Sequence, residues 1–581
     1  MKNMRKLMMA LMALICMSAM ATEGVQLSQS GVRDMLIRVS GQERYLLIPI
    51  EEAAPEYRMQ VIEDGRIVRT VVLRLAAKGK IDYYVPMDLS AFNRESLVLA
   101  VHVWNQPDGE RLREVSPMEY IAWNELKLAN TFDTSNWDKY RPIYHHTPLY
   151  GWMNDPNGMF YKDGVWHLYY QYNPYCSMWQ NMTWAHSSSK DLIHWTHEPI
   201  AIEPDVLGTI FSGSAVVDAN NTAGFGKDAV IAMYTSAELM GQCQSLAYST
   251  DNGLTFTKYS GNPIMTADIP DFRDSNFFWN EQTNEWNLVL ACGQEMRFYA
   301  SADLKNWRYL SAFGSGYGSH SGVWECPDLM RLPVRGTKEH KWVLLCNINP
   351  GGPFGGSATQ YFVGDWDGKT FTCEHNDTRW MDYGKDHYAT VSFSNAPEER
   401  HTMIVWMSNW QYAGQVPTKQ FRSANALPRD IDLFKDKDGR YIIGVRPSPE
   451  CEQLRGEEVT ALPEAAIIEL TTTSKKNPTT LTLSNSKGEK VVMTIDPKTN
   501  TFTMDRRQSG ISDFSESFAA VTTTPLYVNA NKYKVVIYLD RCSLEAFDAD
   551  GHWAMTNLVF PTEPYDQIET NGKVKIYNIK Y

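Results

Sequence analysis

The sequence contains few cysteines, nine in 581 residues, and no C-x-x-C pair. A chain of this length folds around hydrophobic cores, so it does not require a disulfide scaffold. His145, His146 and His167 do not have the spacing of zinc ligands. Residues 436–439 begin like a calcium loop but lack its closing Glu, and a hairpin turn is predicted there. No metal or cofactor is therefore expected.

The chain also lacks an excess of basic residues. It has 55 Lys and Arg against 68 Asp and Glu, a formal net charge of −13. Proteins that bind nucleic acid need a basic face against the phosphates, so no nucleic-acid partner is predicted. The acidic balance is compatible with a neutral substrate. The oligomeric state is left open.

Long apolar runs are missing beyond the N-terminus, so no membrane span is predicted. Residues 1–21 have the layout of a secretory signal peptide: three basic residues, an apolar run, and small residues at the cleavage site. A lipoprotein is disfavoured, because Ile15 stands where a small residue should precede a lipidated Cys16. The sequence thus predicts an exported protein, either periplasmic or extracellular at the cell surface.

Short alternating apolar and polar runs fill most of the chain, which predicts an all-β protein. Residues 22–125 have this alternation between turn signals and are expected to form an N-terminal β-sandwich. Residues 126–140 are polar and are expected to be a linker. Residues 430–581 contain further short β-runs and predict a C-terminal β-sandwich.

Residues 141–429 contain a repeat. Apolar strands recur at intervals of roughly fifty to sixty residues, and similar turns, such as those at 189–195 and 301–307, lie between them. A repeat of this size in all-β sequence is typical of a β-propeller, whose inner strands converge on a central channel. Five strand clusters predict five blades: Val165–Gln171, Ala229–Thr235, Trp286–Ala291, Trp342–Asn347 and Thr402–Met407.

Three acidic residues lie in unusual settings within this repeat. Asp155 follows Trp152 and Met153 and precedes Pro156, which pushes its backbone toward extended geometry. A carboxylate fixed at a tight turn near a channel suits a nucleophile. A surface Asp-Pro-Asn-Gly turn is the alternative, but the preceding apolar residues favour burial.

Glu325 and Asp274 also have two interpretations each. Glu325 lies in an apolar bracket, where burial would raise its pKa and keep a proton for a leaving oxygen; alternatively it pairs with Arg331. Asp274 follows Arg273, and together they would hold adjacent sugar hydroxyls; alternatively they form only a local ion pair. Two carboxyls facing each other across a pocket are what cleavage of a glycosidic bond requires.

With these motifs, the sequence resembles glycoside hydrolase family 32, the β-fructofuranosidases. The resemblance covers about residues 140–581 and does not reach residues 22–125. Six ordered motifs carry it, together with a C-terminal signature at residues 538–547: residues 141–145 leading into 152–158, then 211–215, 273–274, 325–326, 382–389 and 406–410.

The resemblance implies a role for each matched residue. Asp155 would be the nucleophile, Glu325 the general acid/base and Asp274 the stabiliser of the transition state. It also implies a retaining mechanism without metal, a five-bladed propeller with a sandwich, and a separation of about 5–5.5 Å between the nucleophile and acid carboxyls. The fructosyl subsite would be lined by Asn154, Gln171, Trp179, Ser212, Arg273, Asp382 and Trp410.

One position departs from the family pattern. The middle motif usually reads Arg-Asp-Pro, whereas Ser275 follows Asp274 here. Losing the proline ring would free the backbone beside Asp274, but Arg273 and Asp274 both remain. Activity is therefore expected to survive.

The sequence predicts an exported, retaining β-fructosidase that hydrolyses fructan, levan or inulin, and releases fructose from chain ends. The alternatives within the family are a sucrose invertase, an endo-acting levanase and a fructosyltransferase. A fructan-binding protein whose catalysis has lapsed is the alternative from another class. In each case the partner is a fructan or fructo-oligosaccharide.

Overall fold

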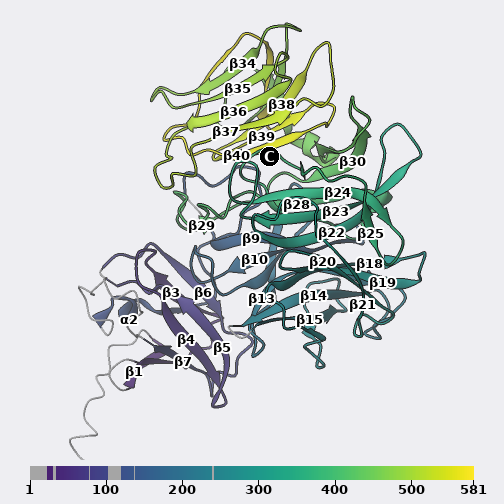
Figure 1. Cartoon of the computed structure of the whole chain (residues 1–581). Coiled ribbons are helices and arrows are strands. Elements are labelled where there is room, and N and C mark those ends of the chain that lie inside the picture. The colour runs from purple at the N-terminus through teal and green to yellow at the C-terminus, as the bar shows by residue number, and fades with distance from the viewer. Residues whose placement is uncertain (1–22, 31–33, 78, 103–118, 136–137, 239–240) are drawn as a thin grey trace, which may run out of the picture.

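The computed structural model describes residues 23–30, 34–77, 79–102, 119–135, 138–238 and 241–581. The predicted signal peptide lies outside these ranges. The described chain is all-β, and its only helical pieces are α2 (Ala122–Glu125) and two 3-10 turns at Pro397–Glu399 and Pro449–Leu454. None of its helices is long and apolar enough to cross a membrane. Figure 1 shows three bodies, with a propeller between two sandwiches.

The N-terminal body consists of two sheets around one hydrophobic core. Apolar side chains alternate along the strands, as in β2, where every second residue is buried. One sheet has the order β1 (Val25–Ser30), β2 (Asp34–Val39), β7 (Val98–His102), β4 (Tyr57–Glu63) and β5 (Arg66–Leu73), and the other β6 (Tyr83–Asp88), β3 (Tyr45–Ile50) and β8 (Lys127–Ala129).

Strand β8 lies within the segment that the sequence predicts to be a linker. It pairs with β3 across Leu128 and Leu46, so the sandwich continues to residue 129. Leu126 is buried and Leu128 is partly buried against the same core. Three residues are too few to give a visible alternation, which is why this strand could not be separated from its polar neighbours.

Five sheets follow around the propeller (Figure 1). The first contains β9 (Gly151–Lys162), β10 (Val165–Asn173), β11 (Thr183–Ser189) and β12 (Thr196–Ile202), and the second β13 (Thr209–Asp218), β14 (Ala229–Glu238), β15 (Gly241–Ser249), β16 (Thr257–Lys258) and β17 (Met265–Thr266). The third contains β18 (Phe272–Asn280), β19 (Glu285–Cys292), β20 (Met296–Ser301) and β21 (Arg308–Phe313), and the fourth β22 (Val323–Pro333), β23 (His340–Asn349), β24 (Ala358–Trp366), β25 (Phe371–Cys373) and β26 (Arg379–Trp380). The fifth contains β27 (Tyr388–Ser392), β28 (Thr402–Trp406), β30 (Arg429–Lys435) and β31 (Tyr441–Pro447).

The repeated sequence features occupy equivalent places in the blades. Each of the five predicted strand clusters falls on the second strand of its sheet, β10, β14, β19, β23 and β28. The repeated turns connect third to fourth strands. In one of them Asp191 accepts the backbone N–H groups of Ile193 and His194, and in another Asp303 does the same for the N–H groups of Lys305 and Asn306. One local hydrogen-bond pattern thus recurs from blade to blade.

The first strands of the five sheets form a closed ring. Strand β9 contacts β13, β13 contacts β18, β18 contacts β22, β22 contacts β27, and β27 returns to β9. The chain also closes the ring with β29 (Phe421–Arg422), which follows the second strand of the fifth sheet and pairs in parallel with Gly151 and Trp152 of β9. These inner strands bring residues distant in sequence to one channel.

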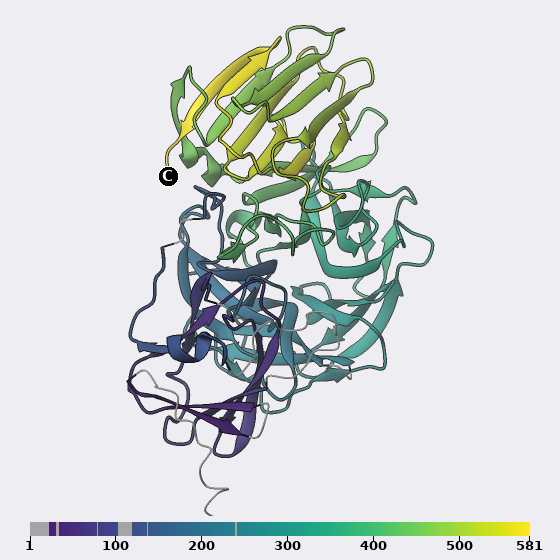
Figure 2. The same ribbon diagram turned by 90° about the vertical axis from the view of Figure 1, so that its left-hand side faces the viewer.

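The C-terminal body is a second sandwich (Figure 2, top). Its six-stranded sheet has the order β32 (Arg455–Val459), β42 (Lys573–Ile579), β33 (Ala466–Thr471), β38 (Lys534–Asp540), β39 (Ser543–Asp548) and β40 (Ala554–Leu558). The opposing sheet has the order β37 (Val521–Pro525), β36 (Thr501–Gln508), β35 (Lys490–Asp496), β34 (Thr479–Ser484) and β41 (Gln567–Thr570). Side chains from both sheets fill its core.

The structure corrects the expected start of this sandwich. Residues 430–447, which the sequence assigned to it, lie almost entirely in β30 and β31, the outer strands of the fifth blade. Strand β30 pairs with β28 at Thr402 and Met403, and so extends the blade sheet. These outer strands lack the Ser-x-Asp turn of the first three blades and are joined by the hairpin turn at residues 436–439. Their sequence could therefore not be told from that of a sandwich.

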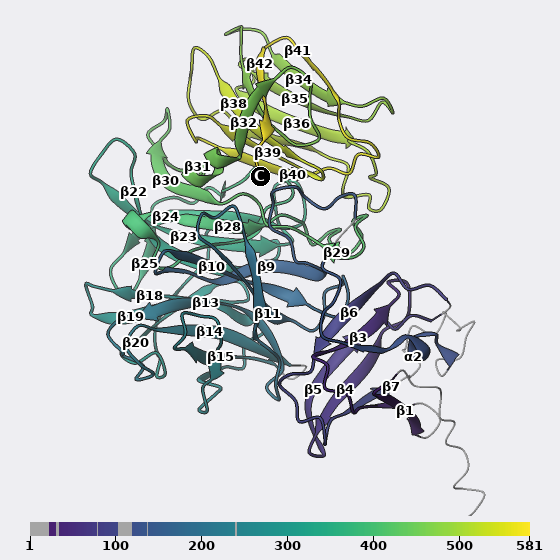
Figure 3. The ribbon, with the colours of Figure 1, turned by 180° about the vertical axis from the view of Figure 1, so that it is seen from behind.

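The C-terminal sandwich is joined to the propeller by buried charged groups. Arg429 of β30 donates to Asp382 at 2.8 Å and to Glu545 of β39 at 2.6 Å. Two nitrogens of His145 lie 2.8 Å from Asp540 and 2.6 Å from Glu545. The side chains of Arg429, His145, Asp540 and Glu545 are 0% exposed. The N-terminal sandwich lies apart from this junction, against the side of the propeller that carries β9 to β11 (Figure 3).

Candidate active site

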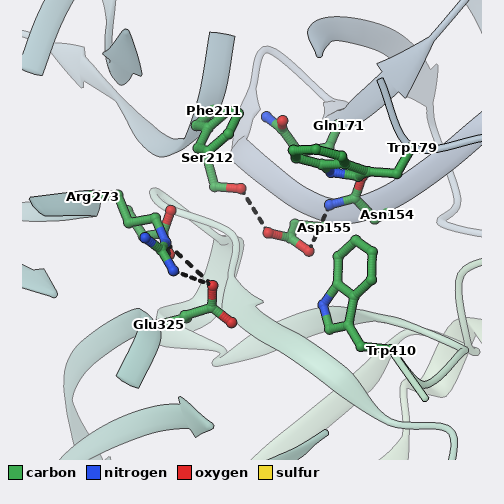
Figure 4. A pocket seen from close by; sticks show the side chains of 10 residues that line it. Asn154, Asp155, Gln171, Trp179, Phe211, Ser212, Arg273, Glu325 and Trp410 are labelled. Atoms are coloured by element: carbon green, nitrogen blue, oxygen red, sulfur yellow. Dashed lines mark hydrogen bonds and ion pairs between the residues drawn. The ribbon is translucent and has the colours of Figure 1, made fainter. Parts of the chain in front are cut away.

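The three predicted carboxyl groups lie together in a pocket of about 350 Å³. Asp155 comes from β9, Asp274 from β18 and Glu325 from β22, which are three of the five inner strands. Nine of the ten residues predicted for the site line this pocket (Figure 4), which is formed by Asn154, Asp155, Gln171, Trp179, Phe211, Ser212, Arg273, Asp274, Glu325 and Trp410.

Each inner strand has an irregularity where it passes the pocket. The regular pairing with the second strand is interrupted between Met153 and Pro156 in β9, and between Arg273 and Asn276 in β18. The same happens after Phe211 in β13, after Glu325 in β22 and after Tyr388 in β27. A β-bulge leaves residues outside the hydrogen-bond ladder and turns their side chains. Five bulges at one level thus aim side chains into the channel.

The carboxylate of Asp155 is held by uncharged donors. Its Oδ1 accepts Nδ2 of Asn154 at 3.0 Å, and its Oδ2 accepts the hydroxyl of Ser212 at 2.8 Å (Figure 4). Burial raises the pKa of Asp155, and the negative charge of Glu325 adds to this, while the hydrogen bonds oppose it. The side chain is therefore fixed in direction without a cation beside it.

Glu325 has a different environment, with both of its oxygens held. Oε1 accepts Nη2 of Arg273 at 2.8 Å and Nε at 3.2 Å, a two-pronged contact (Figure 4). Oε2 accepts the hydroxyl of Tyr388, which comes from the fifth inner strand. The predicted alternative partner of Glu325, Arg331, makes neither of these contacts. Glu325 is thus positioned by groups from two other blades.

Asp274 is influenced by the charges of both other carboxyls. Its Oδ2 accepts the backbone N–H of Cys326 at 3.0 Å, and Nε of Arg273 is 3.9 Å away. Burial raises the pKa of Asp274 to about 7; Arg273 opposes the rise and the charges of Glu325 and Asp155 add to it. Burial and the repulsion from the two other carboxyls therefore favour the protonated form of Asp274.

Ser275 does not displace Asp274 from the pocket. The backbone N–H of Asp274 donates to the hydroxyl of Thr235 at 3.2 Å, and the hydroxyl of Ser275 donates to the carbonyl of Met233 at 3.3 Å. Both contacts reach to β14 in the neighbouring blade. The backbone that lacks the family's proline is therefore tied by side-chain hydrogen bonds instead.

The remaining pocket wall combines an amide with aromatic rings. Nε2 of Gln171 is buried and has no hydrogen-bond partner among the described residues, so it is a donor available to a ligand. Trp410 stacks on Trp152 at 5.8 Å, and Trp179 lies edge-on to Trp410 at 6.5 Å and to Phe211 at 5.9 Å. Such a wall suits the apolar face of a sugar ring.

Comparison with known proteins agrees with this geometry. A family model described as "Glycosyl hydrolases family 32 N-terminal domain" matches residues 145–443, and one described as "Glycosyl hydrolases family 32 C terminal" matches residues 448–581. The chain belongs to glycosyl hydrolase family 32. A third model, "Domain of unknown function (DUF4980)", matches residues 31–144 and thus covers most of the N-terminal sandwich.

Curated family 32 relatives extend over most of the chain. A protein named "Levanase" from Bacillus subtilis is 42% identical over 503 residues, covering 81% of this chain and 74% of its own length. An "Extracellular exo-inulinase" from Aspergillus niger is 35% identical over 497 residues, covering 75% of this chain and 92% of its own. The crystal structure of an exo-inulinase from Aspergillus awamori superposes with a TM-score of 0.72 at 33% identity, covering 77% of this chain and 99% of its own. The protein is a glycoside hydrolase of this family.

Asp382 is the one predicted site residue of this family 32 chain that the structure does not bring to the pocket. Its Oδ2 accepts Arg429 and the hydroxyl of Thr556, both at 2.8 Å, and its Oδ1 accepts the N–H groups of Gly384 at 2.7 Å and Thr556 at 2.9 Å. The residue is 3% exposed. All four contacts lie at the junction with the C-terminal sandwich, so Asp382 serves that junction.

Three residues at the pocket were not singled out from the sequence. Phe211 lines the wall, Tyr388 donates to Glu325, and Sγ of Cys326 lies 3.5 Å from both Asp155 and Asp274. Each belongs to a motif that carries the family resemblance, so a signal was present. The sequence could not show which members of a motif point inward, because the bulges break the alternation of the strands.

No metal is needed to explain the contacts of the pocket. In the described part of the chain, one group of three potential ligands is close enough to hold an ion: Asp548, Asp550 and His552. Oδ2 of Asp548 already accepts the backbone N–H groups of Asp550 and His552, each at 3.2 Å. This is the hydrogen bonding of a hairpin turn between β39 and β40.

Proposed function

We propose that this chain is an exported, retaining β-fructosidase that hydrolyses fructan, levan or inulin, from chain ends. The observation that carries the proposal is the pair Asp155 and Glu325, which line one pocket in unlike surroundings. A retaining glycosidase needs one carboxylate as nucleophile and a second carboxyl as acid and base. The names of the relatives, levanase and exo-inulinase, support fructan as the substrate class.

In the first step, a carboxylate oxygen of Asp155 bonds to the anomeric C2 of the terminal fructosyl unit. The bond between C2 and the leaving oxygen breaks, and Glu325 gives its proton to that oxygen. Asn154 and Ser212 donate hydrogen bonds to Asp155, and these favour the charged form that attacks C2.

In the second step, a water molecule replaces the departed chain. Glu325, now ionised, takes a proton from this water. The oxygen of the water bonds to C2, and the ester bond between C2 and Asp155 breaks. Free fructose leaves, and Asp155 and Glu325 return to their starting protonation. Arg273 and Tyr388 keep the carboxyl of Glu325 in one orientation for both proton transfers.

The other pocket residues suit recognition of the fructosyl unit. The carboxyl of Asp274 and the free amide of Gln171 offer an acceptor and a donor to sugar hydroxyls. Trp179, Trp410 and Phe211 add aromatic surface to the same pocket. The names of the exo-inulinase relatives support exo-action.

Export rests on two observations outside the pocket. The predicted signal peptide at residues 1–21 has the layout of a secretory leader. Several of the relatives carry the word extracellular in their names. Both are consistent with a polymeric substrate that a cell meets outside its cytoplasm.

Product analysis on levan, inulin and sucrose tests the proposal. The parent should release only fructose from at least one polymer, whereas Asp155→Asn and Glu325→Gln should lose about 10²- to 10⁴-fold in kcat. Asp365→Asn is the matched control, since this carboxyl is 69% exposed on the outer part of a blade. It should retain the parent's rate.

The product pattern separates the alternatives. Oligosaccharides in place of fructose would make the chain an endo-acting enzyme, and cleavage of sucrose alone would make it an invertase. Binding of fructan without any product would replace the hydrolase with a binding protein. To test retention, Asp155→Ala is assayed with azide, which should restore turnover and leave a fructosyl azide as product.

A further inference from the structure

We propose that the N-terminal sandwich is a positioning module for the active site. It holds the propeller segment of residues 174–182, which connects β10 to β11, so that Trp179 stays at the pocket wall. Glu52 of the sandwich, with Ser177 and Asn181 of the segment, would be the positioning residues. The inference rests on the proposed function for its kinetic consequence, although the structural part stands separately.

The segment is shared between the two bodies. Trp179 lines the pocket and is 40% exposed, the one large aromatic of the wall that is open to solvent to this degree. Four and three residues before it, Tyr175 and Cys176 are 5% and 1% exposed, and both belong to the hydrophobic core of the N-terminal sandwich. Met178 packs against the same core. The segment therefore inserts side chains into one body and presents Trp179 to the other.

Polar contacts fasten the middle of the segment to the sandwich. The backbone N–H of Ser177 donates to Glu52 at 3.2 Å and lies 3.1 Å from the hydroxyl oxygen of Tyr83. The hydroxyl of Ser177 also contacts Glu52, and Ser177 is 0% exposed. The same hydroxyl contacts the carbonyl of Lys419 in the propeller, so Ser177, two residues before Trp179, is enclosed by partners from both bodies.

A second pair of contacts lies on the other side of Trp179. Nδ2 of Asn181 donates to the carbonyl of Val72 at 2.6 Å, and Oδ1 of Asn181 accepts the N–H of Val72 at 2.8 Å. Val72 lies in β5, so the amide of Asn181 forms the same pair of hydrogen bonds with this strand that the backbone of a neighbouring strand would form. Trp179 is therefore flanked on both sides by contacts to the N-terminal sandwich.

Contacts within the propeller also hold the segment, and they include its middle and its end. Nδ2 of Asn173 donates to the carbonyl of Met178 at 2.8 Å, and Oδ1 of Asn173 accepts Nδ2 of Asn181 at 3.0 Å. Among the described residues, the ring contacts of Trp179 are edge-on, to Phe211 and Trp410. Without the sandwich, the contacts of Ser177 with Glu52 and the core packing of Tyr175 and Cys176 would be lost.

A displaced Trp179 should weaken the binding of substrate more than the chemistry. The carboxyls are fixed by inner-strand bulges and by hydrogen bonds from residues outside the segment, whereas the ring of Trp179 is part of the wall that meets the sugar. Loss of one aromatic contact costs about 0.5–1.5 kcal/mol, which is about a 2- to 13-fold change in affinity. We therefore expect a higher KM with a nearly unchanged kcat.

Hydrogen exchange and kinetics on the full chain test this proposal together. In Glu52→Ala, the backbone amides of residues 174–182 should exchange faster than in the parent, and KM for fructan should rise about 3- to 10-fold. Glu52→Gln keeps an acceptor oxygen and should restore both values. The matched control is Asp34→Ala, whose carboxyl pairs with His102 inside the N-terminal sandwich. It should change neither value.

A double variant separates positioning from a general loss of stability. Trp179→Ala alone should raise KM by a similar factor, and adding Glu52→Ala to it should raise KM no further, because the positioned ring is already gone. Independent, multiplying effects would overturn the proposal. So would unchanged exchange in Glu52→Ala, or faster exchange with the KM of the parent. If the parent cleaves no fructan, the proposed function fails, while the exchange result still decides whether the sandwich holds the segment.

Discussion

The two β-sandwiches are attached to the propeller in opposite ways. The C-terminal junction is built from fully buried charges, with Arg429 between Asp382 and Glu545 and with His145 beside them. The N-terminal junction is built from an inserted propeller segment, backbone contacts and an ion pair of Arg69 with Glu203, whose carboxylate is 37% exposed. If one residue of the first type of junction is replaced, its partner is left as an unpaired charge in the protein interior. In the second type of junction, a single substitution should weaken the attachment only slightly.

The two junctions should therefore affect different properties of the protein. The buried charges lie behind the pocket, where Asp382 joins the fifth blade to the sandwich, and none of them lines the pocket. The N-terminal junction contains Trp179's own segment, so small changes there reach the pocket wall. Stability should therefore depend mainly on one junction and substrate binding on the other.

Breaking the C-terminal junction should have the largest effect. Arg429→Met leaves Asp382 and Glu545 without their buried cation, which should cost about 3–5 kcal/mol of stability and lower the Tm markedly. Arg308→Met is the control, since this arginine is 56% exposed in its pair with Glu285 and should contribute about 0–1 kcal/mol. Thermal unfolding compares the two. Equal melting temperatures for both variants would show that the buried junction stabilises the protein no more than an exposed ion pair does.

The same junction should give stability that depends on pH. Burial disfavours the charged form of His145, but hydrogen bonds and charges of Asp540 and Glu545 outweigh it and raise its pKa to about 9. A histidine whose folded pKa exceeds its unfolded value contributes in full below about pH 6.5, and the contribution is lost as pH rises through about 9. It is on the order of 3 kcal/mol.

Melting temperatures between pH 6 and pH 10 check this contribution. The Tm of the parent should fall across this range, and His145→Gln should start lower and fall less. His194→Gln is the control, because this histidine is 55% exposed, with an ion pair to the nearby Asp191 and a ring contact with Tyr581. A parallel fall in the parent and in His145→Gln would show that other groups cause it.

The pocket should respond in the opposite direction to the C-terminal junction. Burial and Glu325 raise the pKa of Asp155, so its ionisation works against the folded state once the pH exceeds its unfolded pKa. Asp155→Asn removes this charge and should stabilise the inactive protein by about 0.5–2 kcal/mol at pH 7. The gain should shrink toward pH 4. A variant less stable than the parent at pH 7 would contradict the electrostatic cost assigned to the pocket.

Loosening the N-terminal junction should have the smallest effect. Arg69→Gln removes the ion pair with Glu203 and should lower stability by about 0.5–1 kcal/mol, much less than Arg429→Met. Raising the salt concentration should reduce the difference from the parent, because the pair is partly exposed. Chemical denaturation at two salt concentrations measures this. A loss as large as that of Arg429→Met would place both junctions in one class.

Much of the propeller could be predicted because its second strands are regular. They are apolar and evenly spaced, and in three blades a Ser-x-Asp turn follows the next strand, as at Ser189 and Ser301, so the repeat is visible without a structure. The inner strands carry the site but are less regular. Asp155, Asp274 and Glu325 were found from their unusual neighbours and from the family resemblance, and not from strand alternation, which the bulges interrupt.

The features that could not be predicted depend on distant partners. Asp382 lies in a site motif, but its direction is set by Arg429 and Thr556, which follow 47 and 174 residues later. Strands β30 and β31 resemble sandwich strands until their pairing with β28 is known. The attachment of Tyr175 and Cys176 to another body leaves no local mark, because buried residues of one core look like those of any other.

The short parallel pairing of β29 with β9 has a consequence for the order in which the protein becomes active. Residues 421–422 hold the edge of the strand that carries Asp155, and Trp410 completes the wall opposite. A growing chain therefore lacks a finished pocket until more than two thirds of it has been synthesised and the ring has closed. We therefore expect no activity from a folding intermediate with four blades, which has all three carboxyls in its sequence but neither Trp410 in its wall nor Tyr388 on Glu325.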